Sequence, residues 1–117
     1  MGRPPDRTVF KVDKRLQDHI EKNWSGKVVD FELRVRTSFI YVDVEFFQAD
    51  RQFDELEEDG LQPLMRLRYI GSDNEWEFAC HSWAHGARGS YEPSFLMNGQ
   101  PFGTPEECFD CAAFPWR

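Results

Sequence analysis

Hydrophobic and polar residues alternate along two neighbouring segments of the chain, residues 29–36 and 40–46. Every second position is apolar, at Val29, Phe31, Leu33 and Val35, and again at Ile40, Val42, Val44 and Phe46. Period-two alternation over β-branched and aromatic residues indicates a half-buried strand. The run Arg36-Thr37-Ser38 between the two segments is short enough for a hairpin connection. We therefore expect an antiparallel pair of strands here.

A helical pattern precedes these strands. Large apolar residues recur with the spacing of one helix face, at Leu16, Ile20 and Trp24. Asp13 is a suitable N-cap, and Gly26 is a suitable terminator after the last turn. This pattern predicts a helix over residues 13–24. Residues 1–8 are polar and contain two adjacent prolines, so residues 1–10 are expected to be an extended or mobile lead-in.

The second half of the chain repeats the strand pattern. Met65, Leu67 and Tyr69 alternate with arginines, which predicts a strand over residues 64–70. A turn cluster of Gly, Ser, Asp and Asn follows, and residues 76–83 then alternate again. Residues 84–100 are rich in Gly, Ser, Pro and Asn and are expected to form a loop. Residues 95–97 are apolar and could add an edge strand within it.

The clearest local signal lies near the C-terminus. Thr104 can cap a helix, Pro105 suits its first position, and Glu107 occupies the third position of a capping box. A second helix is therefore predicted from Pro105, and Pro115 should stop it. Its apolar face consists of Phe109, Ala112 and Ala113.

The order of these elements is helix, two strands, an acidic connection over residues 48–60, two strands, a long loop and a helix. It predicts an α+β fold, a four- to five-stranded antiparallel sheet with N- and C-terminal helices packed on one face. The length of 117 residues predicts one domain, residues 1–117. The sheet's other face carries polar residues and one aromatic, and it is either solvated or covered by a partner. These residues are Tyr41, Asp43, Glu45, Arg66, Arg68, Glu77 and His81.

Charge and composition narrow the possible functions. The net charge is −7, with nine Lys and Arg against six Asp and Glu in residues 1–36, and five against fifteen in residues 37–117. The acidic majority repels a phosphate backbone, which argues against nonspecific nucleic-acid binding. No apolar run approaches the length of a membrane span, so no membrane partner is expected. The three cysteines do not form an even-numbered disulfide framework, which favours a cytoplasmic location.

Candidate chemistry is concentrated in the segment Trp76–Tyr91, which contains two of the three histidines. If the chain has a ligand site, aromatic residues would stack on the ligand, histidines would donate or accept hydrogen bonds, and an arginine would meet an anionic group. The candidate ligand-binding residues are Tyr41, His81, Trp83, His85, Arg88 and Tyr91. No spacing among them defines a reaction, so no catalytic residue is assigned.

The sequence leaves two alternatives open, a metal site and a catalytic site. Cys108-x-x-Cys111 has the spacing of half a zinc site, but the capping box places Cys108 inside a helix, where a buried cysteine packs as a small hydrophobe. Cys80, His81 and His85 could serve a small metal-dependent or hydrolytic enzyme. The chain has no Gly-x-Ser-x-Gly elbow and no glycine-rich phosphate loop. We therefore assign no metal ligand and expect no cofactor.

The C-terminal part of the chain resembles known sequences. Tyr91-Glu92-Pro93-Ser94, Asn98-Gly99 and the run from Gly103 to Glu107 are similar to short uncharacterised bacterial proteins, including those encoded on integron gene cassettes. The resemblance covers about the last quarter of the chain and implies no activity.

The combined expectation is a non-catalytic binding or self-associating module. Its expected partners are a second copy of the chain, contacted through the sheet face or a sheet edge, and a small-molecule or protein ligand. Aromatic residues at protein surfaces and open sheet edges both favour this interpretation.

Overall fold

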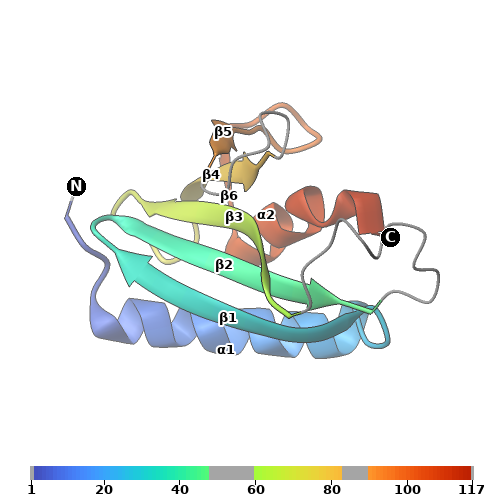
Figure 1. Cartoon of the computed structure of the whole chain (residues 1–117). Helices are drawn as coiled ribbons and strands as arrows, with labels where there is room; N and C mark the ends of the chain where they lie inside the picture. Colours follow the sequence, from blue (N-terminus) through green and yellow to red (C-terminus); the bar gives the residue numbers. More distant parts are fainter. Residues whose placement is uncertain (1, 48–59, 83–89, 117) are drawn as a thin grey trace.

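The computed structural model describes residues 2–47, 60–82 and 90–116. These form one antiparallel sheet with both helices against the same face (Figure 1). The strands are β1 (Val28–Arg36), β2 (Phe39–Phe46), β3 (Gln62–Tyr69), β4 (Trp76–His81), β5 (Tyr91–Pro93) and β6 (Phe102–Gly103). The strand order is β1-β2-β3-β4-β5, and the short β6 also pairs with β4. The predicted α+β fold is confirmed. The acidic connection falls almost entirely outside the described residues.

The first helix, α1 (Asp6–Asn23), is longer than the sequence pattern predicted. It begins at Asp6 directly after the extended Pro5, so Asp13 is not its N-cap and residues 6–10 are not an extended lead-in. The sequence pattern misses the first turn of this helix because the residue that continues the buried face there, Thr8, is polar. The Thr8 hydroxyl donates a hydrogen bond to Asp73 Oδ1 at 3.0 Å, which allows it to be buried. Apolar spacing alone therefore does not predict that turn.

The predicted hairpin between β1 and β2 is confirmed. Arg36 pairs with Phe39 across a two-residue turn, and Thr37 adopts a positive φ of 54° there. A positive φ at the first turn residue is typical of tight hairpins. The expected inward position of Val29 is wrong, because the register shifts between Val28 and Asp30 and Val29 is 56% exposed.

The predicted edge strand at residues 95–97 is also wrong. The strand at this edge is β5 (Tyr91–Pro93), whose residues pair with β4. Phe95 and Met97 are 61% and 75% exposed. The Gly99 N–H donates to the Leu96 carbonyl and the Leu96 N–H to the Gln100 carbonyl. This turn uses those backbone groups locally, so they are not available to a strand.

The second helix, α2 (Pro105–Ala112), begins as predicted. The Glu107 N–H donates to Thr104 Oγ1 at 3.2 Å, and the Thr104 N–H donates to Glu107 Oε1 at 2.9 Å. This reciprocal pair is a capping box. A single 3₁₀ turn, η2 (Phe114–Trp116), follows the helix.

The hydrophobic core lies between the two helices and the sheet. Its largest fully buried side chains include Trp24, Trp76, Phe109, Leu16, Ile40, Met65 and Leu67. A polar seam also joins the helices, where Arg15 forms an ion pair with Glu106 at 2.8 Å. In the same seam, Asp110 Oδ1 lies 2.7 Å from His19 Nε2 and accepts the Trp24 indole N–H at 2.9 Å. Neither helix is long and apolar enough to cross a membrane, within the part of the chain that the structure describes.

Candidate functional site

Three of the six predicted ligand-binding residues come together on the outer face of the sheet, which is the face opposite the helices. The ring of Tyr91 lies 5.4 Å from that of Tyr41 and 5.1 Å from that of His81, both in edge-on geometry. These residues belong to β5, β2 and β4. The other three, Trp83, His85 and Arg88, lie outside the described residues. The structure therefore brings half of the predicted ligand-binding residues together on one face.

Arg66 completes this grouping. It stands on β3 directly opposite Tyr41 of β2. Its guanidinium carbon lies 4.3 Å from the centroid of the Phe39 ring and 5.2 Å from that of Tyr91. Both distances are within the range of cation–π attraction. We call Arg34, Phe39, Tyr41, Asp43, Arg66, His81 and Tyr91 the outer-face cluster.

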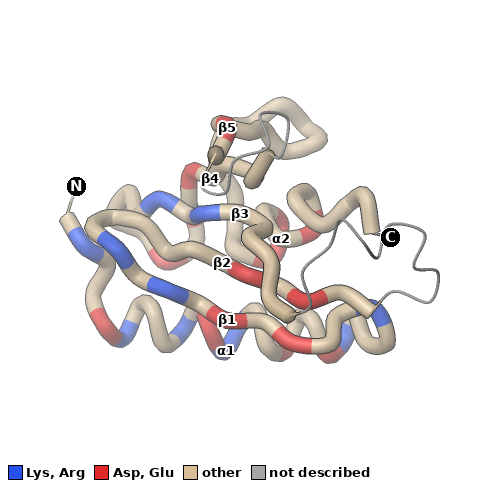
Figure 2. Tube along the Cα trace, viewed as in Figure 1, with Lys and Arg blue, Asp and Glu red and all other residues tan. Residues whose placement is uncertain are grey.

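Charges on this face are unevenly distributed along the strands. The arginines of β1 and β3 lie toward the end where the β1–β2 hairpin turns, and the acids of β1 and β2 lie toward the other end (Figure 2). Arg34 binds both carboxylate oxygens of Asp43, at 2.9 and 3.2 Å. Arg68 forms an ion pair with Glu77 at 3.4 Å. Within residues 2–47, 60–82 and 90–116, no carboxylate lies within ion-pairing distance of Arg66.

The pKa values of two cluster residues reflect their surroundings. The hydrogen bonds from Arg34 to Asp43 raise the pKa of the guanidinium above its ordinary value, although burial opposes this. Burial raises the pKa of the Tyr91 phenol, and the Asp43 carboxylate adds to the effect. At neutral pH the phenol of Tyr91 is therefore protonated and can donate a hydrogen bond.

A hollow of about 160 Å³ adjoins Arg66 on this face. Its walls come from β2, β3, β4 and β5, and they are Phe39, Arg66, Arg68, Glu77, Phe78, Ala79 and Pro93. The hollow thus combines two aromatic rings with two guanidinium groups and one carboxylate, that of Glu77, which is paired with Arg68. Pockets with apolar walls and a few convergent polar groups are where small molecules bind in proteins.

The sequence pattern placed Arg66 on the polar sheet face but did not select it as a ligand-binding residue. Phe39 was not selected either, because it stands at the end of the hairpin turn, where alternation carries little information. The missing signal was the strand register. Tyr41 faces Arg66, and Phe39 faces Arg68, only because β2 and β3 pair in one particular alignment.

The three cysteines have separate environments. Burial raises the pKa of the Cys80 thiol, and it raises the pKa of Cys108 much further. The Cys108 thiol lies 3.9 Å from the Trp76 carbonyl, whereas the Cys111 thiol donates to the Phe95 carbonyl at 3.4 Å. Cys108 is fully buried in the core, which is the packing role that the helical position suggested. The described ranges contain no group of three or more His, Cys, Asp or Glu placed to hold a metal ion.

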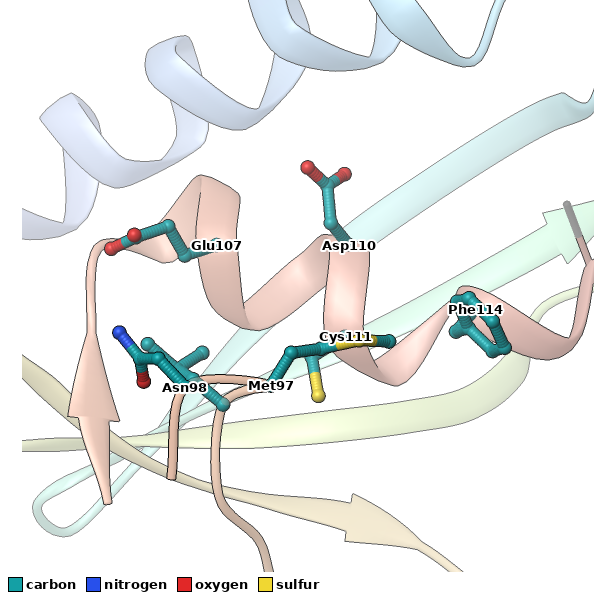
Figure 3. A pocket seen from close by; sticks show the side chains of 7 residues that line it. Met97, Asn98, Glu107, Asp110, Cys111 and Phe114 are labelled. Carbon is teal, nitrogen blue, oxygen red and sulfur yellow. The ribbon is translucent and has the colours of Figure 1, made fainter. Parts of the chain in front are cut away.

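A larger groove, of about 390 Å³, lies between α2 and the loop that precedes β6 (Figure 3). Leu96, Met97 and Phe114 supply apolar walls, and Glu107 and Asp110 lie along the helix side. Both carboxylates already serve the fold, Glu107 in the capping box and Asp110 in the seam between the helices. The outer-face cluster is therefore the stronger candidate site.

No protein-family model, curated protein or solved structure matches this chain.

Proposed function

We propose that the protein is a non-catalytic binding module whose outer-face cluster takes the anionic group of a small molecule. The observation that carries this proposal is the position of Arg66. Its guanidinium contacts the rings of Phe39 and Tyr91 and has no carboxylate partner among the described residues. It also lines the adjoining hollow.

The two ring contacts favour binding by Arg66 for a physical reason. Rings beside a guanidinium restrict its orientation, so less side-chain entropy is lost when a ligand binds. A planar guanidinium can donate two parallel hydrogen bonds to a carboxylate or a phosphate. Tyr91 contributes its ring to the contact with Arg66, whereas its hydroxyl interacts with Arg34.

The charges around Arg66 support its role as the residue that binds the anion. Arg34 and Arg68 are already paired with Asp43 and Glu77, so their charges are compensated within the chain. Among the described residues of this face, Arg36 and Arg66 have no carboxylate partner, and of these two it is Arg66 that lines the hollow. The walls of Phe39 and Pro93 favour an anion attached to an apolar, planar group.

The test is a titration of ¹⁵N-labelled protein with benzoate and with inorganic phosphate, followed by NMR. We expect saturable shifts of amides in β3 and β5, with benzoate binding more tightly than phosphate. Arg66→Gln should weaken the binding at least about tenfold, since a hydrogen bond between charged groups contributes roughly 1.5–3 kcal/mol.

Arg36→Gln is the matched control, because it removes the same charge from the same face of the sheet without changing the lining of the hollow. It should change the affinity much less than Arg66→Gln. Equal losses in the two variants would show that only the general positive potential attracts the anion. The absence of saturable shifts with either probe would contradict the proposal.

A further inference from the structure

β1 forms an open edge of the sheet. Its only strand neighbour among the described residues is β2. It is nine residues long, whereas β5 and β6 at the opposite edge have three and two residues. Proteins usually block a long edge with proline, with a bulge or with charged side chains, lysine above all. The only irregularity in β1 lies between Val28 and Asp30, and residues 30–36 contain no proline and no lysine.

The backbone groups on the open side of β1 can be assigned. Arg36 and Phe39 close a two-residue hairpin, and such a closing pair exchanges hydrogen bonds between its own strands. Alternation then directs the N–H and C=O groups of Phe31, Leu33 and Val35 away from β2. The Phe31 N–H donates to the side chain of Asp30 at 2.8 Å, as expected for a group on the open side.

The charges along β1 are self-complementary. Asp30 and Glu32 form its acidic half, Arg34 and Arg36 form its basic half, and all four are exposed (Figure 2). Consider two copies of β1 in antiparallel orientation about a twofold axis at Leu33. Asp30 of each copy then faces Arg36 of the other copy, and Glu32 faces Arg34, which is also paired with Asp43 of its own chain.

Only the register centred on Leu33 places unlike charges opposite each other along the whole strand pair. A shift of two residues in one direction places Glu32 opposite Glu32, and a shift in the other direction places Arg34 opposite Arg34. Like charges directly opposite each other destabilise a strand pair, whereas opposite charges stabilise it. On the inner face, the favoured register places the half-buried Phe31 opposite Val35 and Leu33 opposite Leu33.

The apolar surface beside this edge is also incomplete. A groove of about 270 Å³ separates α1 from β1, and its apolar lining residues are Ile20, Val28, Val29 and Phe31. Val29 is 56% exposed. A second strand beside β1 would extend the apolar face of the sheet along this groove.

We propose that β1 pairs with β1 of a second copy of this chain, antiparallel and centred on Leu33, to form one continuous sheet. The Asp30 side chain then releases the Phe31 N–H to the second copy and binds Arg36 of that copy. This interface does not use the hollow beside Arg66, so it stands independently of the proposed ligand site.

The test uses sedimentation equilibrium on three samples, wild type, Asp30→Arg and Arg36→Asp. We expect the wild type to form a dimer of two 13.8 kDa chains, weakened by salt. Each substitution turns two of the four charge pairs from attractive to repulsive. Each should therefore raise the dimer dissociation constant about tenfold or more.

An equimolar mixture of the two variants tests the register itself. In a mixed dimer the introduced arginine at position 30 faces the introduced aspartate at position 36, and the remaining native pair is also of opposite charge. The mixture should therefore dimerise although neither variant does so alone. Because the rescue requires both chains to be folded, it separates a lost interface from a lost fold.

Glu75→Arg is the matched control for Asp30→Arg, since it makes the same charge change on the turn between β3 and β4. This variant should remain dimeric. A wild-type chain that stays monomeric at about 100 μM, well above the dissociation constants of stable dimers, would overturn the proposal. If Asp30→Arg and Arg36→Asp each remained dimeric, the proposal that β1 forms the interface would be overturned. If the mixture of the two variants stayed monomeric, the proposed register centred on Leu33 would be overturned.

Discussion

The rings of Tyr41 and Tyr91 lie 5.4 Å apart, although two other strands separate β2 from β5 in the sheet. Strands are spaced about 4.8 Å apart, so three steps across a flat sheet cover roughly 14 Å. Twisting of the sheet and the lean of two long side chains bring the rings together. Figure 1 shows β4 and β5 turned away from the direction of β1 and β2.

The first prediction concerns the phenol of Tyr91. Because burial and the Asp43 carboxylate raise its pKa, one of the three tyrosines should ionise above the ordinary value of about 10. Ultraviolet titration of the folded protein measures this. Tyr91→Phe should remove the late transition, and Tyr69→Phe should preserve it. If the late transition persisted in Tyr91→Phe, it would not belong to Tyr91, and this would contradict the arrangement of the cluster.

The second prediction concerns the first turn of α1. Thr8→Val keeps the shape of the side chain but removes the donor to Asp73, so it should lower the free energy of unfolding by about 1 kcal/mol. Urea denaturation at pH 7 measures the loss. Thr8→Ser keeps the hydroxyl and should retain the hydrogen bond. A valine variant as stable as wild type, together with a loss in the serine variant, would show that the methyl group, and not the hydrogen bond, is responsible.

The third prediction follows from the pKa of Asp73. The hydrogen bond from Thr8, assisted by Lys11, lowers this pKa below the ordinary value of about 3.9. The folded state therefore binds this proton less readily than the unfolded state, and the stabilisation is present above pH 3.9 and is lost as the pH falls through the folded value. Asp73→Asn should melt earlier than wild type at pH 7, and the difference should shrink below about pH 4. A constant difference in melting temperature down to pH 2 would contradict this.

The fourth prediction concerns the capping box of α2. Thr104→Ala removes the acceptor for the Glu107 N–H and should lower the free energy of unfolding by about 1 kcal/mol. Thr104→Ser is the control, since serine is an equally good cap. Chemical denaturation of the three proteins measures the difference, and an alanine variant as stable as the serine variant would refute the role of the cap.

The fifth prediction concerns the cysteines. Cys108 is completely buried and its thiol pKa is strongly raised, so it should react with a thiol reagent at pH 8 only when the protein unfolds. Cys111, which is partly exposed, should react first. Comparison of reaction rates with Cys108→Ala and Cys111→Ala identifies each thiol. Fast modification of Cys108 in the folded protein would contradict its place in the core.

Local signals in the sequence were reliable where they depend on neighbouring residues. The start of α2 was predictable because a capping box needs only Thr104, Pro105 and Glu107 in order. The β1–β2 hairpin was predictable because alternation and a short connection lie within one segment. The beginning of α1 was missed because Thr8 is buried only through its bond to Asp73, 65 residues away.

The candidate site was predictable only in part. Tyr41, His81 and Tyr91 could be selected as aromatic or titratable residues near a polar face, and the structure brings them together. Arg66 could not be selected, because nothing near it in the chain indicates that Phe39 and Tyr91 will lie beside its guanidinium.

The sequence by itself determined the class of fold, the two helical faces and the alternation of the principal strands, because these depend on the periods of the helix and the strand. Tertiary structure decided which residues meet across the sheet. Strand order and register bring Tyr91 to Tyr41 over a separation of 50 residues in the chain, and they leave β1 at an edge of the sheet that the described residues form. Register depends on how all strands pack together against the helices, and no short segment of the chain contains that information.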